Sequence, residues 1–150
     1  MRKSDIRSLT TIAVAISATL SGTTASVGNI VDVSNFQHVT LAYFTGTVTD
    51  AGTAAGFSVE IQESDTTADA DFTAVADTDL IGTEAALAVT DDASDTIPVG
   101  SVGYIGTKKY VRAVITGTTG TDAAVSGAWI LQGPRYAPVV SATAANISAT

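Results

Sequence analysis

The stretch His38-Val-Thr-Leu-Ala-Tyr-Phe-Thr-Gly-Thr-Val48 decides the fold class. Within it Val39, Leu41 and Tyr43 alternate with smaller residues, and this period of two is typical of a β-strand that turns one face towards a core. The rest of the chain has the same character, because its bulky aliphatic residues are mostly Val and Ile and good helix formers are scarce. The sequence therefore predicts an all-β protein.

A second alternating stretch, Phe57-Ser-Val-Glu-Ile-Gln62, follows the first. The segment between them contains Asp50-Ala-Gly52 and Gly56, which supply turn chemistry. We expect 38–48 and 57–62 to form a hairpin.

Further short strands follow from the same pattern, with the bulkier residues of each on one face. We expect Ser64 to Asp71 to be an acidic surface loop, after which Phe72 and Val75 return to the core. The run Ala85 to Val89 could form a helical turn, but it is too short to be stable alone, and we predict a strand. The other predicted strands are 11–17, 30–33, 99–105, 108–116 and 124–132.

About eight short strands at regular spacing indicate one β-sandwich or jelly-roll-like domain. We place this domain at residues 29–138, between an N-terminal arm at 1–28 and an extended C-terminal tail at 139–150. The strand 108–116 is predicted to be central, with Val111 and Ile115 in the core and Tyr110 and Arg112 on the opposite face.

Charge is distributed unevenly along the chain. Its net charge is -8, and no Lys or Arg lies between Arg7 and Lys108, a stretch that holds thirteen of the fifteen acidic residues. Such a surface resists nucleic acid and remains soluble at high copy number, so we expect neither a nucleic-acid nor a membrane partner. The basic start and the apolar run near Leu9 to Leu20 imitate a secretory leader, but Asp5 and several Thr and Ser residues interrupt the pattern, and we expect no cleaved leader.

The sequence contains few of the residues that catalysis commonly uses. The chain contains no Cys and one histidine, His38, and no nucleophile, phosphate-binding or zinc motif is present. We therefore expect no enzymatic activity and no cofactor. The cluster Asp65, Asp69 and Asp71 raises the possibility of calcium, but it lacks the glycine and the closing glutamate of a calcium loop, and a solvated acidic loop is the preferred interpretation, as it is for Asp91, Asp92 and Asp95.

Two groups of residues are candidates for contacts with partners. The N-terminal arm carries the cations Arg2, Lys3 and Arg7 and an apolar stripe, Ile12, Val14 and Ile16. We expect this stripe to pair with a sheet edge in the same subunit, in a neighbouring copy or in a larger assembly, and we favour the last two. The second group combines cations with tyrosines, residue types enriched at interfaces, and consists of Tyr110, Arg112, Arg135 and Tyr136. An internal clamp is the alternative for these residues.

Four segments together resemble a family of small tailed-bacteriophage virion proteins: Phe57-Ser-Val-Glu-Ile-Gln-Glu-Ser-Asp65, Phe72-Thr-Ala-Val75, Val102-Gly-Tyr-Ile-Gly-Thr-Lys-Lys-Tyr-Val-Arg112 and Gly133-Pro-Arg-Tyr-Ala-Pro138. The resemblance runs from about Phe36 to Pro138, leaves the N-terminal arm outside, and brings no catalytic residue with it. It implies a capsid decoration or cement protein on the exterior of the virion, with the major capsid protein and copies of itself, a trimer being possible, as partners.

Two alternatives remain open. A carbohydrate-binding module on the virion surface would display aromatic side chains such as Trp129 or Tyr104 around a groove, and a tail or head-tail connector component would form rings.

Overall fold

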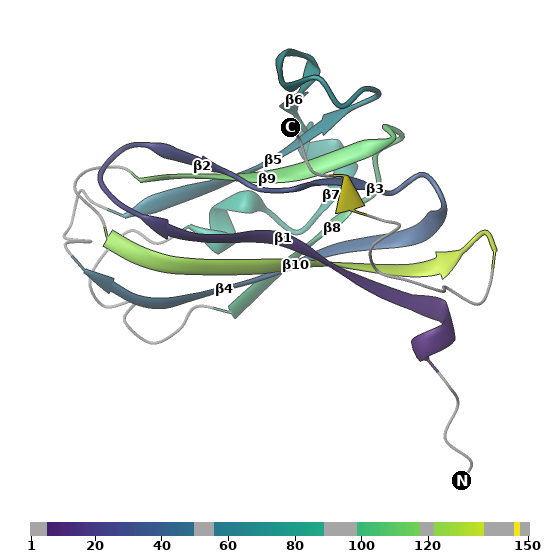
Figure 1. The fold of residues 1–150 in the computed structure, drawn as a ribbon, viewed down its shortest axis with the longest axis horizontal. Helices are drawn as coiled ribbons and strands as arrows, with labels where there is room; N and C mark the ends of the chain where they lie inside the picture. Colours follow the sequence, from purple (N-terminus) through teal and green to yellow (C-terminus); the bar gives the residue numbers. More distant parts are fainter. Residues whose placement is uncertain (1–5, 50–55, 89–98, 118–121, 137–145, 148–150) are drawn as a thin grey trace, which may run out of the picture.

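The computed structural model describes residues 6–49, 56–88, 99–117, 122–136 and 146–147, and it is a two-layer β-sandwich (Figure 1). The predicted all-β sandwich is therefore confirmed. Sheet A has the strand order β1-β10-β4-β8-β7, and sheet B has the order β11-β3-β9-β5-β6, with β2 also paired to β9. In Figure 1, β1, β10 and β4 form the lower layer, and β2, β9 and β5 lie above them.

All strand pairings are antiparallel, and the strands have these bounds: β1 Thr10–Leu20, β2 Ala25–Val27, β3 Ile30–Asp32, β4 Phe36–Thr49, β5 Phe57–Ser64, β6 Thr73–Ala74, β7 Leu80–Ile81, β8 Val99–Tyr104, β9 Tyr110–Gly117, β10 Asp122–Pro134 and β11 Asn146–Ile147. Short 3-10 helices occupy Arg7–Leu9 (η1), Asp69–Asp71 (η2), Asp77–Asp79 (η3) and Glu84–Leu87 (η4). Among the described residues, no helix is long and apolar enough to cross a membrane.

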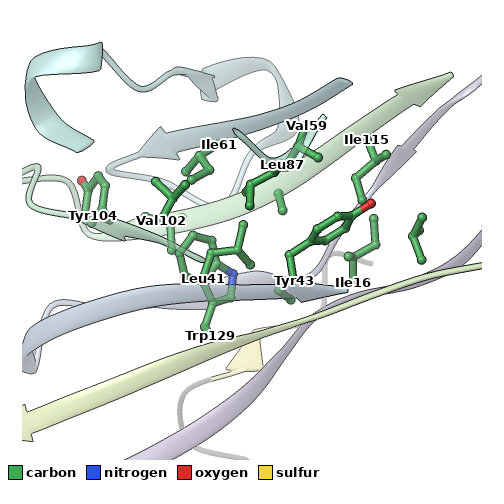
Figure 2. Packing of buried hydrophobic residues seen from close by; sticks show 14 of the residues in the cluster. Ile16, Leu41, Tyr43, Val59, Ile61, Leu87, Val102, Tyr104, Ile115 and Trp129 are labelled. Carbon is green, nitrogen blue, oxygen red and sulfur yellow. The ribbon is translucent and has the colours of Figure 1, made fainter. Parts of the chain in front are cut away.

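The core lies between the two sheets. Figure 2 shows Trp129, Leu41 and Tyr43 of sheet A facing Ile115 and Ile61 of sheet B. The alternation in β4 is confirmed, because Val39, Leu41 and Tyr43 are buried in this core. The central position of β9 is also confirmed: Val111 and Ile115 are fully buried between the sheets, and Tyr110 and Arg112 point to the opposite face.

The predicted hairpin is wrong. β4 lies in sheet A between β10 and β8, whereas β5 lies in sheet B between β9 and β6. The connection passes from one sheet to the other. Alternation and turn residues fit both arrangements, because each strand still turns one face to the same core.

The structure also differs from the prediction of an N-terminal arm. β1 pairs with β10 of the same subunit from Thr10 to Leu20, so this part of residues 1–28 belongs to the sandwich, as does β2. A β-bulge at Ala15 shifts the register between Val14 and Ile16. An extra residue reverses the alternation beyond it, so Ile12 and Val14 face outwards while Ile16 is buried in the core. The predicted apolar stripe is thus divided between two faces.

The chain folds back against the bulge. The Asn29 backbone N–H donates to the Ala15 carbonyl oxygen at 2.8 Å, and its side-chain Nδ2 donates to the Val14 carbonyl at 3.1 Å. Gly28 permits this approach, because a Cβ there would collide with the Ala15 carbonyl. This contact covers part of the free edge of β1.

The predicted strand 124–132 is part of β10, which lies inside sheet A between β1 and β4. One further prediction needs correction. The segment Glu84–Leu87 is the helical turn η4 and not a strand. Leu87 supplies the tertiary support that a turn this short requires, because it is buried in the core and packs on Gly100 of β8. Of the predicted tail at 139–150, the structure describes only β11, which pairs with β3.

Glu84 at the start of η4 accepts a hydrogen bond from the backbone N–H of Ile61 in β5. Burial raises the pKa of this carboxyl, so the folded state favours its protonated form, and the resulting stability is present below the ordinary Glu pKa and lost as the pH rises. We expect Glu84→Gln, which keeps an oxygen acceptor without a charge, to raise the unfolding temperature at pH 7 and to match the wild type near pH 4. Glu84→Ala, which leaves the N–H without its partner, should be less stable at both pH values. Thermal unfolding of the three proteins at the two pH values is the measurement, and equal behaviour of Gln and Ala variants would contradict the assignment.

Candidate functional site

No catalytic constellation is present in the part of the chain that the structure describes. Within it no three His, Cys, Asp or Glu side chains gather to hold a metal ion, and His38 is exposed on β4. The three carboxylates considered for calcium are bound separately: Asp65 to Lys108, Asp69 to Arg112, and Asp71 to the Thr66 hydroxyl. Asp91, Asp92 and Asp95 lie outside the described residues.

Arg112 is an internal clamp and not an exposed contact residue. It lies on the outer face of sheet B, yet only 9% of its side chain is exposed. Its Nη1 donates to Asp69 at 2.7 Å and its Nε to Gln62 at 2.8 Å, while the guanidinium lies 4.1 Å from the centre of the Phe72 ring. Arg112 thus fastens the loop that contains η2 onto sheet B. For Arg112 the structure thus has the internal clamp that the sequence left open as the alternative, with a partner 43 residues away in the sequence.

We expect Arg112→Ala to lower the free energy of unfolding by about 2 kcal/mol, since it removes two hydrogen bonds and the contact with Phe72. Asp69→Ala should cost less than about 1 kcal/mol, because Asp69 remains largely exposed and loses only one partner. Urea denaturation measures both values, and hydrogen exchange should show faster exchange across residues 65–72 in the Arg112 variant. Equal losses in the two variants would contradict the clamp.

Tyr110 is also occupied within the subunit. It is buried with Ile30 and Phe72 in a small apolar cluster on the outer face of sheet B, and the Lys109 ammonium lies 4.8 Å from the centre of its ring. Its predicted role at a subunit contact is therefore wrong.

A second network holds the start of β9. The Tyr104 hydroxyl donates to Glu63 at 2.6 Å and accepts a bond from the Lys108 backbone N–H at 3.0 Å. Burial, and then the bond to Glu63, raise the pKa of Tyr104, so it remains a neutral donor. Lys108 also binds Asp65 at 2.6 Å and holds the pKa of that carboxyl below its usual value. These groups stabilise a turn and leave no free acid or base.

The aromatic residues that a carbohydrate-binding module would display are not available. Trp129 is fully buried in the core, and Tyr104 is buried with its hydroxyl engaged. Among the described aromatic side chains, those with substantial exposure are Phe44 and Tyr136.

The predicted N-terminal site is only partly assembled. Arg2 and Lys3 lie outside the described residues. Arg7 is exposed in η1, before β1. Ile12 and Val14 are exposed on the outer face of sheet A, with 60% and 48% of their surface accessible, whereas Ile16 is in the core.

Arg135 and Tyr136 follow β10 directly at one end of the sandwich, where both are exposed. Gly133, at a positive φ of 63°, turns the chain there, and the Arg135 backbone N–H donates to Asn35 at 2.7 Å. A shallow pocket of about 280 Å³ adjoins them, lined by Ser34, Asn35, Phe36, Gln37, Pro134 and Arg135. Both side chains are exposed, and their role at an interface stays a prediction.

Sequence reasoning missed the outer face of sheet A as a whole. Its five strands, β1, β10, β4, β8 and β7, contain a single Asp, Glu, Lys or Arg residue, Asp122. The lack of charged residues in these segments can be read from the sequence. It identifies a surface only when the order of the strands places the segments side by side.

No protein-family model and no curated protein sequence matches the chain. Solved structures with some similarity include PBSX exported protein XepA (15% identity, TM-score 0.42, covering 89% of this chain and 39% of that chain) and the K1 cleaved adhesin domain of Lys-gingipain from Porphyromonas gingivalis W83 (15% identity, TM-score 0.40, covering 76% and 66%). A third is turnip yellow mosaic virus (10% identity, TM-score 0.30, covering 94% and 89%). The chain thus spans well under half of the XepA chain. Similarities of this size carry no information on function.

Proposed function

We propose that the chain is a non-enzymatic virion structural protein of a tailed phage, and that it decorates the outside of the head by binding the major capsid protein. The observation that carries the proposal is the acidic side of the sandwich. Three cations on that side are paired with aspartates: Lys108 with Asp65, Lys109 with Asp32, and Arg112 with Asp69. Acidic residues in excess of these pairs remain on β5 and on the connections that follow it up to β8, namely Glu60, Glu63, Asp71, Asp77, Asp79 and Glu84.

An acidic outer surface suits a protein present at high copy number on a particle. Like charge keeps neighbouring copies soluble and repels free nucleic acid. The resemblance of the segments around Tyr104–Arg112 to tailed-phage virion proteins supports the same role.

For attachment to the shell we propose the end of the sandwich that carries Arg135 and Tyr136. Arginine and tyrosine are enriched in the energetically dominant part of protein interfaces, and here both are exposed beside a shallow pocket. We do not propose Arg112 and Tyr110, the other two predicted contact residues, for attachment because both are buried within the subunit.

The test is sedimentation of the purified protein with phage heads that lack it, followed by counting copies per particle. We expect saturable binding at tens to hundreds of copies that persists in 0.5 M salt, in which the Debye length is about 4 Å and exposed ion pairs are strongly screened. Tyr136→Ala and Arg135→Glu should weaken binding at least tenfold. Lys109→Glu, a matched charge reversal on the sheet B side, should not.

Three outcomes would overturn the proposal. Release of the wild-type protein from phage heads at moderate salt would mean that exposed ion pairs hold it there. About a dozen copies per particle would favour a ring-forming connector. Hydrolysis of a substrate that one substitution abolishes would contradict the non-enzymatic role.

A further inference from the structure

Apart from Asp122 at the start of β10, the strands of sheet A contain no Asp, Glu, Lys or Arg residue. Antiparallel register places residues from neighbouring strands in rows: Ile12 opposite Ile130, Ile130 opposite Thr40, and Thr40 opposite Gly103. Parallel rows contain Val14, Ala128, Ala42 and Ser101, and then Ser17, Ser126 and Phe44. No described side chain on this face is Asp, Glu, Lys or Arg.

The face is also apolar at several points. Ile12, Val14, Phe44 and Ile81 are between 48% and 63% exposed, and apart from Ile130 the residues in the rows between them are small: Thr, Ser, Ala and Gly. A sheet face that remains in water normally carries alternating polar and charged residues, and a continuous uncharged patch with exposed aliphatic groups marks a contact surface.

We propose that this face is a homodimer interface, in which the outer faces of sheet A from two copies of this chain pack against each other around a two-fold axis. The distribution of charge favours a second copy of this chain, in this orientation, as the partner. The chain has a net charge of -8, and most of its acidic residues lie on sheet B and its connections, so two copies repel one another in most orientations. Packing sheet A on sheet A opposes no described ionised side chain and leaves the two acidic sides facing away from each other.

The dimensions are sufficient for such a dimer. The five strands range from two residues in β7 to fourteen in β4 and average about nine. At about 3.4 Å per residue and about 4.8 Å between strands, they give a face of roughly 700 Å² per copy, or about 1,400 Å² in the pair. Stable interfaces begin at about this size, so a dissociation constant in the micromolar range is expected. The small residues at the centre, Ala42, Ala128 and Gly103, allow the sheets to approach to the usual spacing of about 10 Å.

The proposal does not depend on the phage role. It is tested on the full chain by sedimentation equilibrium, where the wild type is expected to be a dimer at tens of micromolar. Ala42→Glu places two like charges against each other near the centre of the face and should weaken dimerisation at least a hundredfold with an unchanged circular dichroism spectrum. Ser58→Glu, on the exposed outer face of sheet B, is the matched control and should leave the dimer intact.

A cross-link keeps the test independent of the stability of the charge variant. The chain has no cysteine, so Ala42→Cys introduces a single thiol on the central strand of sheet A. Mild oxidation should join two copies of Ala42→Cys within minutes, whereas Ser58→Cys should remain largely uncoupled. A monomeric wild type at 100 micromolar, an Ala42→Glu dimer as tight as the wild type, or equal coupling of the two cysteine variants would each overturn the interface. A dimer that fails to bind heads would instead refute the decoration role alone.

Discussion

Val111→Asp is expected to leave the protein unfolded under conditions in which the wild type is folded. Val111 is fully buried on β9, the central strand of sheet B, and its strand neighbours are Val31 on one side and Glu63 on the other. The core around it consists of hydrophobic side chains, so the new carboxylate would have no cation beside it. Burying an unpaired charge costs several kcal/mol, and the side chain also loses its packing, whereas a domain of this size has about 5–15 kcal/mol of stability in total.

Far-UV circular dichroism and urea denaturation measure the result. Ser58→Asp, on the adjacent strand β5 with its side chain exposed on the outer face, should change the free energy of unfolding by less than about 0.5 kcal/mol. A Val111→Asp protein with a cooperative transition like that of the wild type would show that the inner and outer faces of sheet B are exchanged.

The second large effect is expected from deletion of residues 2–17, and it is the opposite of what removal of an N-terminal arm would cause. An arm that fastens neighbours could be removed without unfolding the domain. β1, however, covers the edge of β10 and contributes Ala13, Ala15 and Ile16 to the core. Its loss would expose Trp129 and Leu131 of β10 along a new sheet edge, so we expect an unfolded or aggregated product.

The control is deletion of residues 2–6, which keeps η1 and β1 and should leave the unfolding temperature within a few degrees of the wild type. Light scattering and thermal unfolding distinguish the two deletions. A folded, monodisperse protein lacking residues 2–17 would mean that the pairing of β1 with β10 contributes little to the fold.

The elements that the sequence predicted well are those decided by local alternation. Val39, Leu41 and Tyr43 are buried in β4, and Val111 and Ile115 are buried in β9, because a strand in a sandwich must turn one face to the core whatever its neighbours are. The existence of strands and the choice of inner face therefore needed no knowledge of topology.

The features that were missed depend on contacts between distant residues. The sheet in which β5 lies is decided by its pairing with β9, not by the turn that follows β4. Arg112 appeared available because its partner Asp69 is far away in the sequence. The bulge at Ala15 has no composition that marks it, yet it moves Ile16 from the outer face to the core. For the candidate site, Arg135 and Tyr136 were predicted from their residue types, which are enriched at interfaces, whereas the uncharged face required the order of five strands.

The covered edges of sheet A have a consequence for a protein that is crowded onto a surface. Asn29 binds the carbonyls of Val14 and Ala15 on one edge, and on the other edge the two-residue strand β7 pairs with the end of β8. An uncovered strand would offer a template on which chains could add one after another into fibrils, and crowding accelerates that process. Because each edge is covered in part, growth by strand addition is hindered at both sides of sheet A, which favours closed, finite contacts between faces and ends.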